Sequence, residues 1–224
     1  MDNTKPWVLI PTALRTHALG HISVWYSAGY NVGLFVDNDA YIDEDVRGYS
    51  HLLVAAEYPG VWKAWNILAK AAIGLGAQVC VLAGDDMDPD EHWSGPKIMA
   101  EYIGHFPILD GVMQPCGDPQ GKDANGVPAA ARICGSPWVG QEWIERAYLG
   151  RGPVNSDYNA FYADEELLHY ATRRGKLWMR PELVQFHHHW SFGHLPRQDY
   201  HERNQLTWQQ DKDLFEARQK AGFP

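Results

Sequence analysis

The sequence predicts an α/β protein in which a largely parallel sheet is covered by helices on both faces. Short apolar runs alternate with helical stretches through the first half of the chain, as expected of strand–helix units. These runs are continuously apolar, which indicates strands that are buried on both sides. The 224 residues contain no internal repeat and no low-complexity linker, so we expect a single domain.

Turn residues and apolar periodicity delimit the elements of the first half. We expect strands at residues 7–11, 31–36, 51–55, 78–83 and 108–113. We expect helices at residues 18–29, at residues 61–75, and after residue 89 as far as about residue 105. In the second of these helices apolar side chains recur every three to four residues, and Gly74 and Gly76 end it. In sheets of this type ligands bind beyond the carboxyl ends of the strands.

The second half of the chain is less regular. Residues 115–128 are rich in Gly, Pro and Asp and are expected to form a long loop, either functional or simply exposed. Helices are expected at residues 139–148 and 164–174, with one or two short strands between residues 177 and 186. Residues 198–221 are polar and predict a helix packed on the outside or against a partner.

Charge and cysteine content exclude several classes of protein. With 19 Lys and Arg against 28 Asp and Glu, the net charge of −9 gives no general attraction to nucleic acid or anionic lipid. No apolar run approaches the roughly 20 residues of a membrane span, and the first residues do not resemble a signal peptide. Three widely spaced cysteines fit a reducing compartment. We therefore expect a cytoplasmic protein.

An acidic motif directly follows the most apolar expected strand. Asp85, Asp86 and Asp88 lie within four residues, where their charges repel one another unless a cation or solvent relieves them. Carboxylate oxygens suit Mg²⁺ or Mn²⁺, which often bridge protein carboxylates and substrate phosphates. A solvated turn is the alternative, with Asp88 as the N-cap of the next helix and Pro89 at its first position.

Three consecutive histidines form a second candidate site. In an extended segment His187 and His189 face one way and His188 the other. Imidazole is a common ligand for ions such as Mn²⁺ and can complete a site begun by carboxylates. Alternatives are hydrogen-bonded core histidines, a Zn²⁺ site or an exposed loop.

A third candidate site opens the helix expected at residue 164. Asp164 and Glu165 there follow a polar, aromatic segment, and a general base needs a carboxylate held at such a defined position. Acidic residues are also favoured at helix N-termini by the dipole alone. Motifs of P-loop NTPases, dinucleotide-binding folds, serine hydrolases and zinc deaminases are absent from the sequence.

Taken in order along the chain, these features resemble a known family. They are Ile10-Pro11-Thr12 with Arg15, then Asp37, the acidic motif after residue 83, Asp164-Glu165, and the late histidines. This order is similar to that of GT-A glycosyltransferases, closest to the family-2 type, over about residues 7–190. The compact chain also resembles small bacteriophage-encoded members.

The resemblance implies a single-domain, Rossmann-like GT-A fold and a role for each candidate residue. It implies donor contacts from Pro11, Thr12, Arg15, Asp37 and Asp85. It implies metal ligands among Asp86, Asp88, His187 and His189. The family's DXD motif maps either to Asp86-Met87-Asp88 or to a variant Gly84-Asp85-Asp86, and a late histidine that binds the metal in some members maps to the histidine tract. It also implies that Asp164 or Glu165 is the catalytic base. About residues 1–113 would form the nucleotide-sugar-binding half, about 114–197 the acceptor and metal half, and 198–224 a C-terminal helix.

The implied reaction is direct displacement at the anomeric carbon of a nucleotide-diphosphate sugar, with Mn²⁺ or Mg²⁺. The acceptor would carry a free hydroxyl, as a glycan, lipid, protein or modified nucleobase does. Asp164 or Glu165 as base would make the reaction inverting. A sugar-nucleotide nucleotidyltransferase is one alternative, although the glycine-rich basic loop typical of that class is missing after the first strand. A non-catalytic nucleotide- or sugar-binding module is another.

Overall fold

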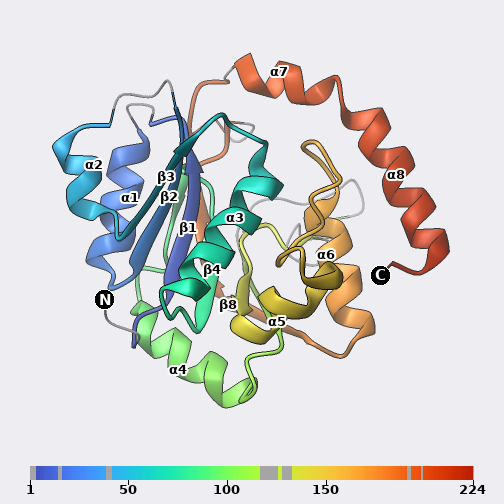
Figure 1. Ribbon diagram of the computed structural model, residues 1–224, viewed down its shortest axis with the longest axis horizontal. Helices are drawn as coiled ribbons and strands as arrows, with labels where there is room; N and C mark the ends of the chain where they lie inside the picture. The colour runs from blue at the N-terminus through green and yellow to red at the C-terminus, as the bar shows by residue number, and fades with distance from the viewer. Residues whose placement is uncertain are drawn as a thin grey trace.

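The computed structural model describes residues 4–14, 17–38, 42–116, 126–127, 133–190, 193–197 and 199–223. Seven strands form one sheet in the order β3-β2-β1-β4-β7-β6-β8, with helices on both faces (Figure 1). These strands are β1 (Trp7–Thr12), β2 (Asn31–Asp37), β3 (Leu52–Ala56), β4 (Val79–Leu82), β6 (Val112–Cys116), β7 (Trp138–Gly140) and β8 (Leu177–Val184). Only β7 runs antiparallel to its neighbours. The expected α/β class with a mostly parallel sheet is confirmed.

The inner strand β1 shows why the expected strands are continuously apolar. It pairs in parallel with β2 on one side and β4 on the other, and all of its residues are buried. Trp7 and Leu9 belong to one hydrophobic core, while Val8 and Ile10 belong to the other. Both faces of the strand are thus covered, as expected for a parallel sheet.

Helices cover the two faces of the sheet. One face carries α1 (Ala18–Ser27), α2 (Glu44–Tyr49) and α4 (Gly95–His105). The other carries α3 (Val61–Gly74), α5 (Gln141–Arg146) with the short 3₁₀ helix η2 (Ala147–Gly150), and α6 (Ala163–Arg173). Among the described residues, no helix is long and apolar enough to cross a lipid bilayer.

Three expected boundaries differ from the structure. The strand expected at residues 108–113 begins only at Val112. The helix expected at residues 139–148 begins only at Gln141, because residues 138–140 form strand β7. This strand pairs with β4, and its residues Trp138 and Val139 also pair with β6. Here Gly140 is required: a side chain at this position would meet the Leu109 carbonyl oxygen.

The helix expected after Pro89 also begins later. Asp88 is not its N-cap, because α4 starts at Gly95 and is preceded by Ser94. Asp90 instead accepts hydrogen bonds from the backbone amides of His92 (2.8 Å) and Val184 (2.7 Å). The alternative interpretation of Asp88 as a helix cap was therefore wrong, which leaves its carboxylate for other contacts.

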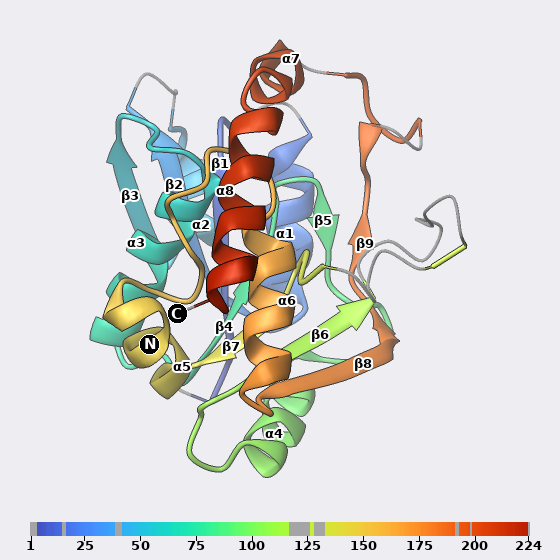
Figure 2. The same cartoon turned by 90° about the vertical axis from the view of Figure 1, so that its right-hand side faces the viewer.

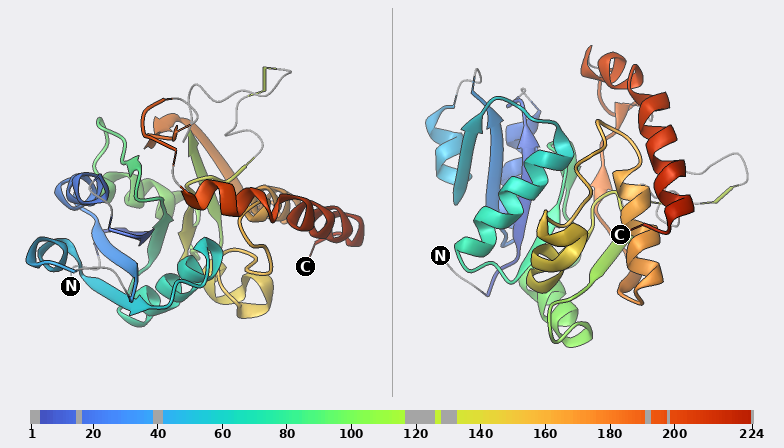
Figure 3. Two further views of the ribbon diagram at one scale, coloured as in Figure 1. Left: turned by 90° about the horizontal axis from the view of Figure 1, so that it is seen from above. Right: turned by 45° about the vertical axis from the view of Figure 1, so that its right-hand side comes forward.

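The polar C-terminal segment forms two helices, α7 (Asp199–Gln205) and α8 (Trp208–Ala221). Figures 2 and 3 show α8 lying beside α6, with α7 on the side of the molecule where the central strands end. Phe215 of α8 joins the hydrophobic core, and Arg218 pairs with the buried Glu166 of α6 at 2.8 Å. The segment thus packs on the outside of its own chain.

Candidate functional site

The acidic motif lies just beyond the carboxyl end of β4, in the middle of the sheet. Met87 and Asp88 form a short strand, β5, which pairs antiparallel with β9 (Phe186–His187). The buried Trp25 of α1 anchors this ribbon, since its indole N–H donates to the Met87 carbonyl at 2.7 Å. The pairing brings together the acidic motif and the histidines, which lie about one hundred residues apart in the chain.

Asp85 faces the end of β1. The Thr12 hydroxyl donates to Asp85 Oδ2 at 2.7 Å and accepts from the Leu14 amide at 2.9 Å. Pro11 and Thr12 are buried at the end of this strand, and Asp37 lies half-buried at the end of neighbouring β2. These expected donor-binding residues thus line adjacent strand ends, whereas Arg15 lies outside the described residues.

Asp86 faces two histidines. Its Oδ2 lies 3.3 Å from His187 Nε2, and its backbone carbonyl accepts from the His188 amide at 2.8 Å. Burial alone would raise the pKa of Asp86, but the hydrogen bond from His187 and the charges of His187 and His189 outweigh it and lower that pKa. Asp86 is therefore ionised at neutral pH.

Asp88 lies between two other imidazoles. Its Oδ1 is 2.7 Å from His21 Nδ1, and its Oδ2 is 2.8 Å from His188 Nε2. Burial opposes ionisation, but these two hydrogen bonds dominate and lower the pKa of Asp88. The hydrogen bond to Asp88 in turn raises the pKa of His21, against the opposing effect of burial.

The histidine rings divide as strand alternation predicts. The rings of His187 and His189 lie 4.9 Å apart, while His188 lies 4.6 Å from the ring of His21 on α1. His21 was not among the residues expected from the sequence. A detectable signal was its spacing of four residues from His17, the residue just before α1, because side chains four apart in a helical stretch lie near each other. The centroids of the two rings are 6.2 Å apart.

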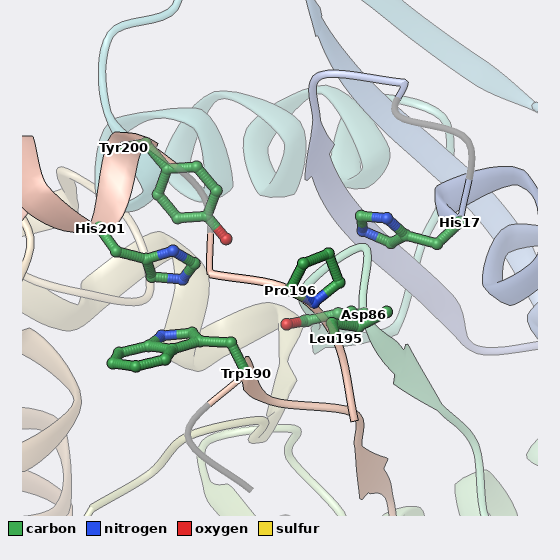
Figure 4. A pocket seen from close by; sticks show the side chains of 7 residues that line it. All are labelled: His17, Asp86, Trp190, Leu195, Pro196, Tyr200 and His201. Atoms are coloured by element: carbon green, nitrogen blue, oxygen red, sulfur yellow. The ribbon is translucent and has the colours of Figure 1, made fainter. Parts of the chain in front are cut away.

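A small pocket opens beside Asp86. Figure 4 shows Asp86 at one wall and the aromatic rings of Tyr200, His201 and Trp190 at another. The remaining lining residues are His17, Leu195 and Pro196. Tyr200 and His201 lie on α7, which brings them to this side of the sheet, whereas Trp190 directly follows the histidines in sequence. No sequence pattern pointed to them.

Asp164 and Glu165 occupy the first turn of α6. A short turn joins the C-terminal end of α6 to the start of β8, and the helix lies beside α8 (Figures 2 and 3). Asp164 Oδ1 accepts from the Glu165 amide at 3.0 Å. Burial raises the pKa of Asp164 to about 6, a value suited to a group that gains and loses a proton near neutral pH.

Comparison with known proteins gives structural matches only. No protein-family model matches the sequence, and no curated protein is significantly similar. The crystal structure of S. aureus TarS matches with a TM-score of 0.57 at 12% identity, over 82% of this chain and 36% of that chain. The structure of TarS 1–349 in complex with UDP matches with a TM-score of 0.51 at 10% identity, over 81% of this chain and 60% of that one.

This chain thus spans 36% of the TarS chain and 60% of the 1–349 piece. At such low identity the likeness concerns the arrangement of the backbone. In this chain the arrangement is a seven-stranded sheet with one antiparallel strand. The chain has a GT-A-like fold.

Proposed function

We propose that this protein transfers a sugar from a nucleotide-diphosphate sugar to the hydroxyl of an acceptor. One observation carries the proposal. Asp85 and Asp86 lie together with the late histidines beyond the carboxyl ends of β1 and β4, in a GT-A-like sheet. Ligands of open α/β sheets bind at this edge. The similar fold of TarS 1–349 has been crystallised with UDP, which supports a nucleotide as part of the donor.

The donor nucleotide is assigned to the ends of β1 and β2. Pro11, Thr12 and Asp37 lie there, and Arg15 follows β1 in sequence. Thr12 holds Asp85 through the 2.7 Å hydrogen bond, so the acidic loop is positioned relative to the nucleotide site. We assign the donor diphosphate to the space beside Asp86, which also borders the aromatic pocket.

A divalent cation fits the residues around Asp86. This carboxylate is held ionised, and His187 and His189 add imidazole nitrogens nearby. A mixed oxygen and nitrogen donor set suits Mn²⁺ better than Mg²⁺, which prefers oxygen alone. When bound, such an ion offsets the negative charge that builds on the departing nucleoside diphosphate.

Asp164 or Glu165 is proposed to take the proton of the acceptor hydroxyl. The acceptor oxygen forms a bond to the anomeric carbon as the bond from that carbon to the diphosphate oxygen breaks, and the hydroxyl proton passes to the carboxylate. Displacement from the opposite face inverts the anomeric centre. Asp164 is preferred, because a pKa of about 6 leaves it largely ionised at pH 7 yet still basic.

The test is incubation of the protein with a panel of nucleotide sugars, Mn²⁺ and candidate hydroxyl acceptors. Acceptor-dependent release of nucleoside diphosphate, lost in Asp86→Asn and retained in His92→Ala, supports the proposal; His92 is an exposed histidine outside the site. If a sugar 1-phosphate and a nucleoside triphosphate instead release inorganic diphosphate, the protein is a nucleotidyltransferase. Nucleotide-sugar binding without release of either product would indicate a binding module.

A further inference from the structure

The two edges of the seven-stranded sheet carry different kinds of strand. At one edge, β8 contains Arg180, Pro181 and Glu182, and its pairing with β6 shifts register after Pro115. Charged residues, proline and irregular pairing keep an edge strand from pairing with another chain. At the other edge, β3 reads Leu-Leu-Val-Ala-Ala and pairs with β2 in one continuous register. The strand β3 therefore lacks the features that protect β8.

The backbone of β3 is open on its outer side. Among the described strands β3 pairs with β2 alone, and Figure 2 shows it at the outer margin of the sheet. The Ala56 carbonyl accepts from the Asn38 amide at 3.1 Å, so the backbone groups of Ala56 face β2. Since alternate residues of a parallel strand direct these groups to opposite sides, those of Leu53 and Ala55 point away from the sheet.

The two ends of β3 differ in charge. Glu57 directly follows the strand and is exposed. His51 precedes it, and burial together with the charge of Lys5 lowers the pKa of this histidine. The neutral ring accepts from the Val32 amide at Nδ1, at 3.1 Å, so its own proton lies on Nε2. One end of the strand is thus acidic, and the other offers a cation and a hydrogen-bond donor.

We propose that β3 pairs antiparallel with β3 of a second copy of this chain, across a twofold axis at Val54. In the register that pairs all five residues, Leu53 and the partner's Ala55 exchange two backbone hydrogen bonds, and the symmetric pair exchanges two more. The same register sets Glu57 opposite the partner's His51 at both ends of the ribbon. A parallel arrangement would instead bring the two acidic ends together.

The contact is small, so the dimer is expected to be reversible. Stable interfaces bury roughly 1,200–2,000 Å², and one pair of five-residue strands supplies only part of this area. We therefore expect a dissociation constant between about 1 μM and 1 mM. The inference concerns the sheet edge and does not rest on the proposed sugar transfer.

The experiment is sedimentation velocity of the full-length protein over that range of concentration. The wild type should change from a particle of 25.4 kDa to one of twice that mass as the concentration rises. Ala55→Pro removes an amide that points away from β2, so the variant should keep the β2–β3 pairing and fold, which thermal unfolding checks. By symmetry it removes two hydrogen bonds from the dimer and should weaken dimerisation at least about 10-fold.

A charge exchange tests the register. Glu57→Lys sets a lysine opposite the partner's His51 and Lys5 and should weaken dimerisation about 10-fold. Adding Lys5→Glu to this variant restores opposite charges at both ends and should recover the dimer. Glu91→Lys is the matched control, because it makes the same change of charge at a side chain that is 85% exposed in the loop before α4.

Two results would overturn the proposal. The first is a monomer at every concentration. The second is equal dimerisation of the wild type, Ala55→Pro and Glu57→Lys, which would place the contact elsewhere on the molecule. Neither readout needs a substrate or a metal ion, so failure here is distinct from failure of the proposed transfer.

Discussion

Two groups of carboxylates in this molecule differ in the groups that they contact. In the acidic loop, Asp86 and Asp88 are partly exposed and face imidazoles. Between α6 and α8, Glu166 and Asp211 are fully buried. Glu166 meets the Arg218 guanidinium at 2.8 and 3.0 Å and accepts from the Tyr158 hydroxyl at 2.6 Å.

Asp211 shows the same pattern without a cation. It accepts hydrogen bonds from the backbone amides of Asn159, Ala160 and Phe161 and from the Asn159 side chain, at 2.8 to 2.9 Å. Partners of this kind cannot leave, because an arginine stays protonated and a backbone amide keeps its hydrogen. Imidazoles, in contrast, can release a proton and bind a metal. We infer that the α6–α8 carboxylates are structural and that the acidic loop is available for ligands.

The largest effect should come from neutralising the acidic loop. Asp86→Asn should reduce sugar transfer below detection while the unfolding midpoint stays close to that of the wild type, because a neutral amide is a poorer ligand for a hard cation. EDTA should have the same effect, and Mn²⁺ should reverse it. Transfer rates and thermal unfolding measure the two quantities. Full activity in EDTA would contradict the assignment.

The next effect concerns the base. Asp164→Asn should lower the turnover number about 10²–10⁴-fold, the range typical of losing a general base, while affinity for the donor stays unchanged. Glu165→Gln should be measured beside it, by single-turnover transfer and by nucleotide binding. Near-normal transfer in both variants would remove these residues from the reaction and favour a retaining mechanism. Loss of donor binding in both would give them a structural role.

The buried cluster should respond in stability. Arg218→Ala leaves Glu166 as a buried charge without its counter-ion and should lower the free energy of unfolding by about 3–5 kcal/mol. Arg151→Ala is the matched control, because its ion pair with Asp157 has the same 2.8 Å distance but side chains that are 44% and 45% exposed. That variant should lose at most about 1 kcal/mol. If chemical denaturation gives equal losses of unfolding free energy for the two variants, burial does not distinguish the two ion pairs.

The smallest effect is a pH dependence of the protein's stability that comes from Asp164. The folded pKa of Asp164 is raised to about 6, from an ordinary value of 3.8. Its contribution to stability is therefore fully present below pH 3.8 and is lost as the pH rises through about 6. Asp164→Asn should reduce the loss of stability between about pH 4 and pH 7, measured by denaturation midpoints. An unchanged difference would show that Asp164 titrates normally.

Much of the fold could be predicted because it depends on short-range patterns. The strands around β1 are continuous apolar runs, and α3 has apolar residues at helical spacing. The antiparallel strand β7 could not be predicted, since its three residues are extended only by pairing with β4 and β6. The start of α4 was also misplaced, because Asp90 caps a local turn and contacts β8 instead of beginning a helix.

The candidate site divides in the same way. The sequence by itself determined the acidic motif and the histidine alternation, because residue type and a two-residue period are local properties. Only the tertiary structure decided that Asp88 meets His21, 67 residues away, and that Tyr200 and Trp190 border Asp86. Such contacts depend on the pairing of β5 with β9 and on where α1 and α7 lie, which no local pattern encodes. The local sequence therefore determines the chemistry of each group, and tertiary packing determines its partners.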